Sequence, residues 1–255
     1  MSRRARLLLF AAAGPGLAAV MLIGLGGLPP FGDYHGIYGL LLAKTEVSLR
    51  RATDIVTALN FDIRAFDTLG EEFILFASVA GVALLLRRLR GEHQEHRARG
   101  IEDHRFAGAS EGLRLASLIM IPLIVALGVY IIVHGQLTPG GGFQGGIVLA
   151  AAPVAILLGG RYLTLKRIAP EWALEGLDAF GAMAYVLIGL GGLIFAGTFF
   201  KNFLPFGDAG QLLSAGTMPL NSIAVGLEVT GAFLLVWTEF LDQTLISAGP
   251  EAEKG

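Results

Sequence analysis

Six long apolar segments limit what this chain can fold into. A helix that crosses a bilayer needs roughly 20 mainly apolar residues to span about 30 Å of hydrocarbon. The six segments cover residues 7–28, 69–86, 115–134, 145–160, 177–200 and 220–240. We therefore expect an all-α membrane protein with about six transmembrane helices, of which the second and fourth are short.

The composition agrees with a membrane protein and excludes several other classes. The chain is 54% hydrophobic and 16% charged, whereas soluble domains carry about 25% charged residues. It has no cysteine, which excludes disulfides, iron–sulfur clusters and thiolate zinc sites. The net charge of −2 gives no basic field for nucleic acid, so we expect the lipid bilayer and other membrane proteins as its surroundings.

The distribution of basic residues predicts the orientation in the membrane. The first apolar segment follows the basic sequence MSRRAR, but it is longer than the roughly 7–15 apolar residues of a secretion signal. We expect it to be retained as a helix. With the N-terminus inside, 14 of the 19 Lys and Arg residues fall on the inner side. The positive-inside rule therefore predicts a multi-pass protein with both termini in the cytoplasm.

Two connections between the apolar segments have sequence patterns that predict a specific structure or role. Residues 45–59 place apolar side chains among charged ones at helical spacing, which predicts an amphipathic external helix. Residues 91–111 are polar and mixed in charge, and we interpret them as a cytoplasmic linker between a two-helix unit and a four-helix unit. The histidines of that linker form no firm metal-ligand pattern, so no metal site is predicted.

Glu228 is the acid that the sequence places deepest in an apolar segment. It lies eight residues after Leu220, about 12 Å along a helix. A carboxylate at that depth costs at least a few kcal/mol unless it is neutral, paired or hydrated. One interpretation is a proton or ion site, and the other is a protonated glutamate that holds neighbouring helices together.

Three further acids lie where the second apolar segment begins. Glu71 and Glu72 follow the sequence DIRAFDTLG, and buried carboxyls of this kind can exchange protons near neutral pH or bind a cation. The structural alternative is helix capping, with Asp67 or Thr68 as the N-cap and both glutamates in the first turn. Both interpretations remain open on the residues alone.

The sequence HGQLTPGGGFQGG, residues 134–146, separates the third and fourth apolar segments. His134 could relay protons, or it could simply form a hydrogen bond at the interface. The glycines permit positive φ and close backbone approach, and Pro139 stops a helix. We expect a tight, re-entrant turn that is packed against other helices, because irregular backbone at this depth must be satisfied by protein or water. The motif residues are Pro139, Gly140, Gly141, Gly142, Phe143, Gln144, Gly145 and Gly146.

This glycine motif resembles the signature of the MnhB subunit of the Mrp (Mnh) multi-subunit Na⁺/H⁺ antiporters. The downstream sequence GGLIFAGTFFKNFLPFGDAGQLLSAGTMPLNSIAVGLEVTGAFLL is similar to the same family, so the resemblance covers residues 112–242. The sequences LPPFGD and NFDIRAFDTLGEEFILF resemble the C-terminal tail of the large antiporter subunit, which occurs as a separate small chain in membrane-bound hydrogenase relatives. In this part Ala65 replaces the usual glycine, and Glu71 matches the family's glutamate.

The resemblance implies a fusion of a large-subunit tail, residues 1–90, with an MnhB-like domain, residues 112–255. It implies membership of a prokaryotic cell-membrane complex related to the ion-pumping arm of respiratory complex I. Large antiporter-like and small Mrp-type subunits are its expected partners. The resemblance implies Na⁺ and H⁺ as the transported ions, and it implies no cofactor.

Three functions are compatible with that resemblance. The chain could be a non-catalytic subunit of a cation/proton antiporter, without a redox centre of its own. It could belong to the same module within a membrane-bound hydrogenase or related oxidoreductase, in which redox subunits are the partners. It could also be a purely structural scaffold. The ion- or proton-handling candidates are Asp67, Glu71, Glu72, His134 and Glu228.

Overall fold

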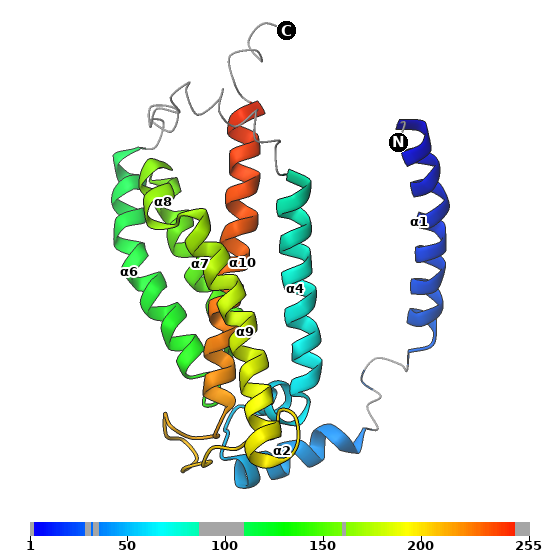
Figure 1. Ribbon diagram of the computed structural model, residues 1–255, viewed down its shortest axis with the longest axis vertical. Helices are drawn as coiled ribbons and strands as arrows, with labels where there is room; N and C mark the ends of the chain where they lie inside the picture. Colours follow the sequence, from blue (N-terminus) through cyan, green and yellow to red (C-terminus); the bar gives the residue numbers. More distant parts are fainter. Residues whose placement is uncertain (1–2, 29–31, 33–35, 87–109, 160–161, 248–255) are drawn as a thin grey trace, which may run out of the picture. The chain divides into compact units, whose positions relative to one another are not determined.

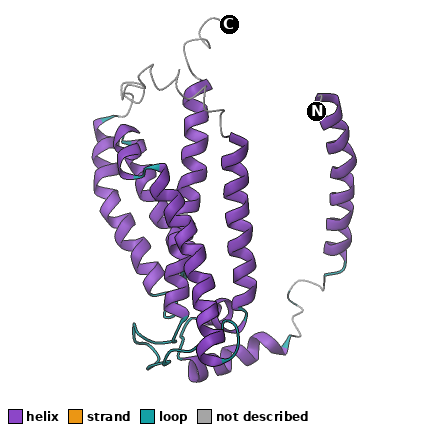
Figure 2. Cartoon of the chain, viewed as in Figure 1, coloured by secondary structure: helices purple, strands orange, loops and turns teal. Residues whose placement is uncertain are grey.

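The computed structural model describes residues 3–28, 32, 36–86, 110–159 and 162–247. Helices dominate this part of the chain, and none of these residues forms a strand (Figure 2). The chain divides into two compact units, Met1–Leu41 and Leu42–Gly255. The first unit contains α1 (Arg3–Gly26) and the start of α2 (Ile37–Arg50), and the second contains the rest of the described helices.

The long helices of the second unit pack side by side as a bundle (Figure 1). They are α4 (Ala65–Leu86), α6 (Glu111–Val133), α7 (Gly142–Leu158), α9 (Glu171–Ala196) and α10 (Met218–Ser247). Helix α10 packs against α9, α7, α4 and α6. Its apolar span is 61% buried, against 11–22% for α4, α6 and α9. The side chains of α10 are therefore the ones most fully enclosed by the protein.

Among the described residues, four helices are long and apolar enough to cross a bilayer, namely α4, α6, α9 and residues Met218–Leu241 of α10. Shorter apolar helical stretches cover Ala13–Gly26 of α1 and all of α7. The predicted all-α membrane fold is confirmed. The expectation that the second segment is short was wrong, because α4 has 22 residues and begins four residues before the apolar run.

Capping groups set several of the helix ends. The Ser110 side chain accepts a hydrogen bond from the Leu113 N–H at 3.2 Å and so satisfies a free donor at the start of α6. Helix α9 begins directly after Pro170 and ends at Gly197, which takes the left-handed φ of 77°. A short helix, α8 (Tyr162–Ile168), lies between α7 and α9 in the chain.

Residues 45–59 do not form the single amphipathic helix that their spacing predicts. Helix α2 ends at Arg50, and Arg51 takes a φ of 58°, which a helix cannot continue through. Asp54 then starts α3 (Ile55–Ala58), since its side chain accepts a hydrogen bond from the Thr57 N–H at 2.9 Å. The π-helix η1 (Leu59–Ile63) follows and leads into α4.

The prediction that Asp67 or Thr68 is the N-cap of the second apolar helix was also wrong. Only Arg64 separates η1 from α4, so the helix already begins at Ala65. Asp67 lies in the first turn of α4. The Thr68 hydroxyl donates instead to the carbonyl oxygen of Asn60 at 2.9 Å.

The predicted linker, residues 91–111, lies outside the described residues except for Ser110 and Glu111. Its histidines fall in the same undescribed part. The division into units at that linker therefore stays a prediction. Within the described residues, α4 packs directly against α10 and α9, so the helices on the two sides of the linker share one bundle.

Candidate functional site

The glycine motif is part turn and part helix. Gly140 and Gly141 take φ values of 151° and 110°, which a residue with a side chain rarely adopts. The tight turn expected here is therefore present, and it connects α6 to α7. Helix α7 begins at Gly142, three residues before the expected start of the fourth apolar segment at 145, so residues 142–144 are helix and not turn.

Two glycines of the motif bring α7 into backbone contact with α10. A Cβ on Gly142 would lie 2.5 Å from the carbonyl oxygen of Ser222 and 2.5 Å from Val225 Cβ. A Cβ on Gly146 would lie 2.8 Å from Val229 Cβ. Both distances are too short for a real side chain, so glycine at these positions permits the helices to approach closely. This packing explains much of the glycine content of the motif.

Hydrogen bonds join the turn to the connection between α2 and α3. The carbonyl oxygen of Gln136 accepts from the N–H groups of Thr53 and Asp54 at 3.0 and 3.2 Å. The Thr53 hydroxyl donates to the carbonyl oxygen of Leu137 at 2.6 Å. The fully buried Gln136 side chain donates from Nε2 to the carbonyl oxygen of Leu212 at 2.8 Å. The turn therefore holds together segments from both of the predicted units.

His134 contacts Tyr130 at the end of α6. Its ring stacks on Tyr130 with 4.1 Å between the ring centroids, and its Nδ1 lies 3.0 Å from the carbonyl oxygen of Tyr130. Its backbone N–H also donates to that oxygen, again at 3.0 Å. The structure places His134 against its own helix, and a role for it in proton transfer stays a prediction.

Glu72 and Glu228 meet inside the bundle. Glu72 on α4 is 3% exposed and Glu228 on α10 is fully buried. Their carboxyl groups lie close enough for each to affect the other electrostatically. Counted from the helix starts at Ala65 and Met218, they lie about 10 and 15 Å along spanning helices. The two predicted candidates therefore form one pair inside the bundle, which we call the acid pair.

The acid pair has no donor from the rest of the described chain. None of its four carboxyl oxygens accepts a hydrogen bond from another described group. Two ionised carboxylates offer only acceptors, so they can bond to each other only when one of them holds a proton. Two neighbouring buried charges of the same sign would be strongly unfavourable. The geometry can therefore hold a proton between Glu72 and Glu228.

Asp178 on α9 is a third buried acid beside this pair. It is 4% exposed, and one of its carboxyl oxygens has no partner among the described groups. Its carboxyl lies within electrostatic range of both Glu72 and Glu228. Sequence reasoning missed it because it stands at the edge of the apolar run. The signal that could have found it is Pro170, which starts α9 early and so places Asp178 two turns inside the helix.

Glu71 and Asp67 lie on a different face of α4 from the acid pair. Both are exposed in this chain, whereas their neighbours Thr68 and Glu72 on α4 are buried. Asp67 forms an ion pair with Arg64. Adjacent helix positions are about 100° apart, so the buried and exposed acids occupy different faces of α4.

A charged cluster lies at the end of the bundle where α4 begins. Arg50 Nε lies 2.7 Å from Asp62 Oδ2, and the Arg50 guanidinium lies 5.6 Å from the centroid of the Phe206 ring. Burial raises the pKa of the Asp62 carboxyl above its ordinary value, while Arg50 and a hydrogen bond from Asn202 oppose the rise. Burial likewise raises the pKa of Glu46, with Arg50 opposing it. This cluster places ionisable groups at the end of the bundle where α4 begins.

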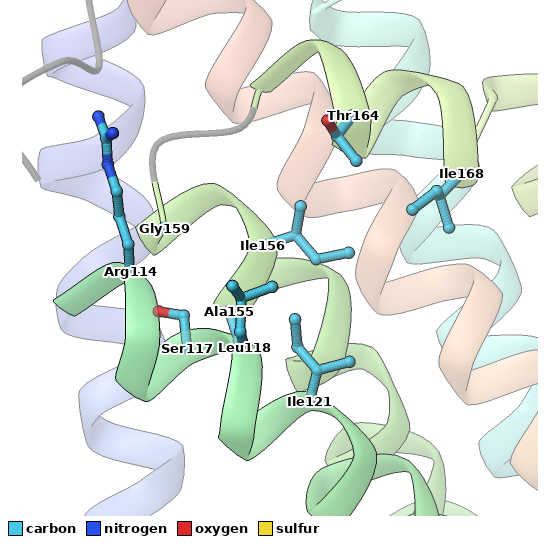
Figure 3. Close-up of a pocket in the computed structure, with 9 residues that line it drawn as sticks. All are labelled: Arg114, Ser117, Leu118, Ile121, Ala155, Ile156, Gly159, Thr164 and Ile168. Atoms are coloured by element: carbon cyan, nitrogen blue, oxygen red, sulfur yellow. The ribbon is translucent and has the colours of Figure 1, made fainter. Parts of the chain in front are cut away.

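A cavity of about 280 Å³ lies elsewhere, between α6, α7 and α8 (Figure 3). Its lining is mostly apolar, with Arg114, Ser117 and Thr164 as the polar side chains. None of the predicted ion-handling residues lines it. Within the described residues, no three His, Cys, Asp or Glu side chains are arranged to hold a metal ion.

Comparison with known sequences identifies similar proteins. Residues 112–235 match the family described as a domain related to the MnhB subunit of Na⁺/H⁺ antiporter. The uncharacterized protein MJ1307 of Methanocaldococcus jannaschii is 33% identical over 203 residues, and the match covers 71% of this chain and 76% of that protein. The Na⁺/H⁺ antiporter B-subunit of Alkalihalophilus pseudofirmus is 35% identical over 72 residues, which cover 28% of this chain and 49% of the relative.

Two solved structures share the fold. A chain of the membrane-bound sulfane sulfur reductase, an archaeal respiratory membrane complex, has a TM-score of 0.68 and 28% identity. That match covers 94% of this chain and 97% of the other. A chain of the Mrp complex from Dietzia sp. DQ12-45-1b has a TM-score of 0.65 and 22% identity, and the match covers 94% of this chain and 26% of the other. The second likeness concerns the fold alone.

Proposed function

Because this chain belongs to the family related to the MnhB subunit of Na⁺/H⁺ antiporters, we propose that it is an integral-membrane component of an Mrp-type cation/proton antiporter complex. Its part in that complex is to bind protons at the acid pair and to support assembly. The family is a family of transporters. The chain spans the prokaryotic cell membrane several times, with both termini in the cytoplasm.

The observation that carries the proposal is the acid pair, Glu72 and Glu228. Each carboxylate at the middle of a membrane costs a few kcal/mol or more. Leucine or glutamine at these positions would hold the helices together without that cost. A proton shared by the pair removes one charge, and loss of that proton restores it. The pair therefore has the chemistry of a site that takes up and releases protons as ions move.

The arrangement also supports a role in assembly. We propose that residues 1–90 correspond to the tail of a large antiporter subunit and residues 112–255 to an MnhB-like domain, joined by the linker at 91–111. The glycine turn bonds to residues 53–54, so it holds the two parts together. Exposed apolar side chains on α4 and α9, such as Phe73, Ile74, Ile194 and Phe195, provide surface for lipid and for other membrane subunits.

We propose that Glu71 and Asp67 lie at an interface with a partner subunit. Both are exposed on a helix that is long and apolar enough to cross the membrane. A carboxylate that faces lipid is costly, so this face of α4 fits a partner protein or a water-filled path. On this view Glu71 takes part in ion transfer between subunits, as the family motif implies.

A second candidate is the same module within a redox-driven complex. The likeness to a chain of the membrane-bound sulfane sulfur reductase extends over nearly the whole of both chains and favours it. The chain has no cysteine, so iron–sulfur clusters of such a complex would be bound by other subunits. Extraction of the intact complex in mild detergent distinguishes the two. Large antiporter-like subunits alone support the antiporter, and iron–sulfur subunits support the redox-driven complex.

The proposal is tested by proton transport in everted membrane vesicles. Wild-type membranes should dissipate a pH gradient when Na⁺ is added, and Glu228→Gln should abolish this while the complex still assembles. Glu175→Gln is the matched control, since Glu175 is exposed on α9 one turn before Asp178. If Glu228→Gln transports normally, the acid pair does not handle protons. If the complex fails to assemble instead, the glutamate is structural.

A further inference from the structure

Helices α9 and α10 are in backbone contact along the seam that holds the acids. A Cβ on Gly181 would lie 2.4 Å from the Glu228 backbone nitrogen, and a Cβ on Gly231 would lie 2.6 Å from that of Asp178. The helices therefore run antiparallel with Gly181 opposite Glu228 and Asp178 opposite Gly231. Asp178 consequently lies about one helical turn, roughly 5 Å, beyond the level of Glu228.

Tyr185 lies on the other side of the acid pair, toward the charged cluster at the start of α4. Its side chain is fully buried, and its hydroxyl donates to the carbonyl oxygen of Ala65 at 3.0 Å. The hydroxyl also lies within hydrogen-bonding reach of the Thr68 hydroxyl and within electrostatic range of Glu72. Thr68 and Glu72 are both buried one turn apart on α4, so their side chains are neighbours on one face.

We propose that Tyr185 and Asp178 extend the acid pair into a proton relay along the seam of α4, α9 and α10. Tyr185, with Thr68, connects the pair to the end of the bundle where Arg50 and Asp62 lie. Asp178 connects it to the opposite end. This relay rests on the proposed function of the acid pair and adds a route to it.

The burial of these groups, together with their lack of donors, also points to a ligand at this site. The carboxyl oxygens of Glu72 and Glu228 are more than nine-tenths buried and unpartnered, and one oxygen of Asp178 is likewise without a partner. Glu71 is the other titratable group of α4 near the seam, and it is exposed. Acceptors that face one another without a donor fit a proton as their ligand. The relay therefore assigns a proton as the ligand of the three acids.

Each transfer in the relay conserves atoms and charge. The Tyr185 hydroxyl gives its proton to the Glu72 carboxylate and takes one from the Thr68 hydroxyl. Thr68 takes one in turn from a water molecule at the end of the bundle, so each O–H bond that breaks is replaced. Glu72 passes a proton to Glu228, and Glu228 passes one to Asp178. Rotation of the two hydroxyls, including release of the bond from Tyr185 to Ala65, resets the relay. A hydroxyl can do this because it is both donor and acceptor.

The relay is tested with Tyr185→Phe, which removes only the hydroxyl, and Asp178→Asn, which keeps the side-chain shape. Transport is measured on the intact complex in vesicles. Each variant should lower the rate of Na⁺-dependent proton movement by at least about tenfold, with normal assembly. Asp178→Glu should recover part of the rate, because it restores a carboxyl. Glu175→Gln should leave the rate unchanged.

The outcomes separate the relay from the function on which it rests. Normal rates in both Tyr185→Phe and Asp178→Asn, together with loss of transport in Glu228→Gln, would overturn the relay and leave the acid pair in place. A normal rate in Glu228→Gln would overturn both. If Tyr185→Phe does not assemble, Thr68→Val takes its place, with Thr164→Val in the distant cavity as control. A normal rate in Thr68→Val would then count against this route.

Discussion

The seam between α9 and α10 makes a quantitative prediction about Gly181. A Cβ there would lie 2.4 Å from the Glu228 backbone nitrogen and 2.7 Å from the carbonyl oxygen of Ala224. Backbone atoms cannot move away as a flexible side chain can. In Gly181→Ala the two helices must therefore separate by about 1 Å, which forfeits about a quarter to a half of the attraction at each contact along the seam.

The expected cost follows from two opposing effects. Overpacking of this kind costs about 1–3 kcal/mol. Replacement of glycine by alanine within a helix returns about 0.5–1 kcal/mol. Gly181→Ala should therefore destabilise the bundle by roughly 1–2 kcal/mol, which is a factor of about 5–30 in the ratio of folded to unfolded protein.

Gly176→Ala is the matched control for this prediction. Gly176 lies on the same helix, and a Cβ there would meet no atom within 4 Å. It should stabilise α9 by about 0.5–1 kcal/mol. The assay is the amount of tagged chain that still elutes with the intact complex after heating. Equal thermal midpoints for Gly181→Ala and Gly176→Ala would refute the backbone contact between α9 and α10.

Four further predictions concern other parts of the chain. Arg50→Met leaves the buried Asp62 charge unpaired and should lower the free energy of unfolding by roughly 1–3 kcal/mol. A second change, Asp62→Asn, should recover most of that loss. The thermal midpoint of the complex measures both effects. Burial raises the pKa of Asp62, so the folded state binds a proton on this carboxyl more tightly than the unfolded state does. This contribution to stability is present at low pH, and it is lost as the pH rises from the ordinary pKa through the raised one. Asp62→Asn alone should remove that slope, and an unchanged slope would contradict the burial. Gln136→Leu leaves the carbonyl oxygen of Leu212 without its donor and should cost about 1–3 kcal/mol, whereas an unchanged thermal midpoint would show that the turn does not depend on this bond. Since the chain has no natural cysteine, single cysteines introduced near each terminus should react with a membrane-impermeant thiol reagent only from the cytoplasmic side, and labelling of either from outside would reverse the orientation.

The existence and order of the spanning helices could be predicted from the sequence because long apolar runs have few other solutions. Glu228 could be singled out for the same reason, since a carboxylate within such a run is conspicuous. Its partner could not be predicted. Glu71 and Glu72 are adjacent and chemically alike, and only the packing of α4 against α10 decides that Glu72 is the buried one.

The remaining differences have local physical causes. The break at Arg51 depends on one residue in a left-handed conformation, which apolar spacing does not reveal. Asp178 was missed because the apolar run begins later than the helix does. The fourth apolar helix was expected from residue 145, but α7 already begins at Gly142, which lies in close contact with Ser222 and Val225 of α10. Each of these depends on tertiary contacts that the sequence pattern does not contain.

The central claim is that Glu72 and Glu228 act together as one proton site. The most direct measurement is a double-mutant cycle on Na⁺-coupled proton transport by the purified complex in proteoliposomes, with Glu72→Gln, Glu228→Gln and the double variant. A shared site predicts that each single change lowers the rate by about as much as the double change does, because residues that act as a unit are not additive. Independent, multiplicative losses, or wild-type transport in either single variant, would contradict it.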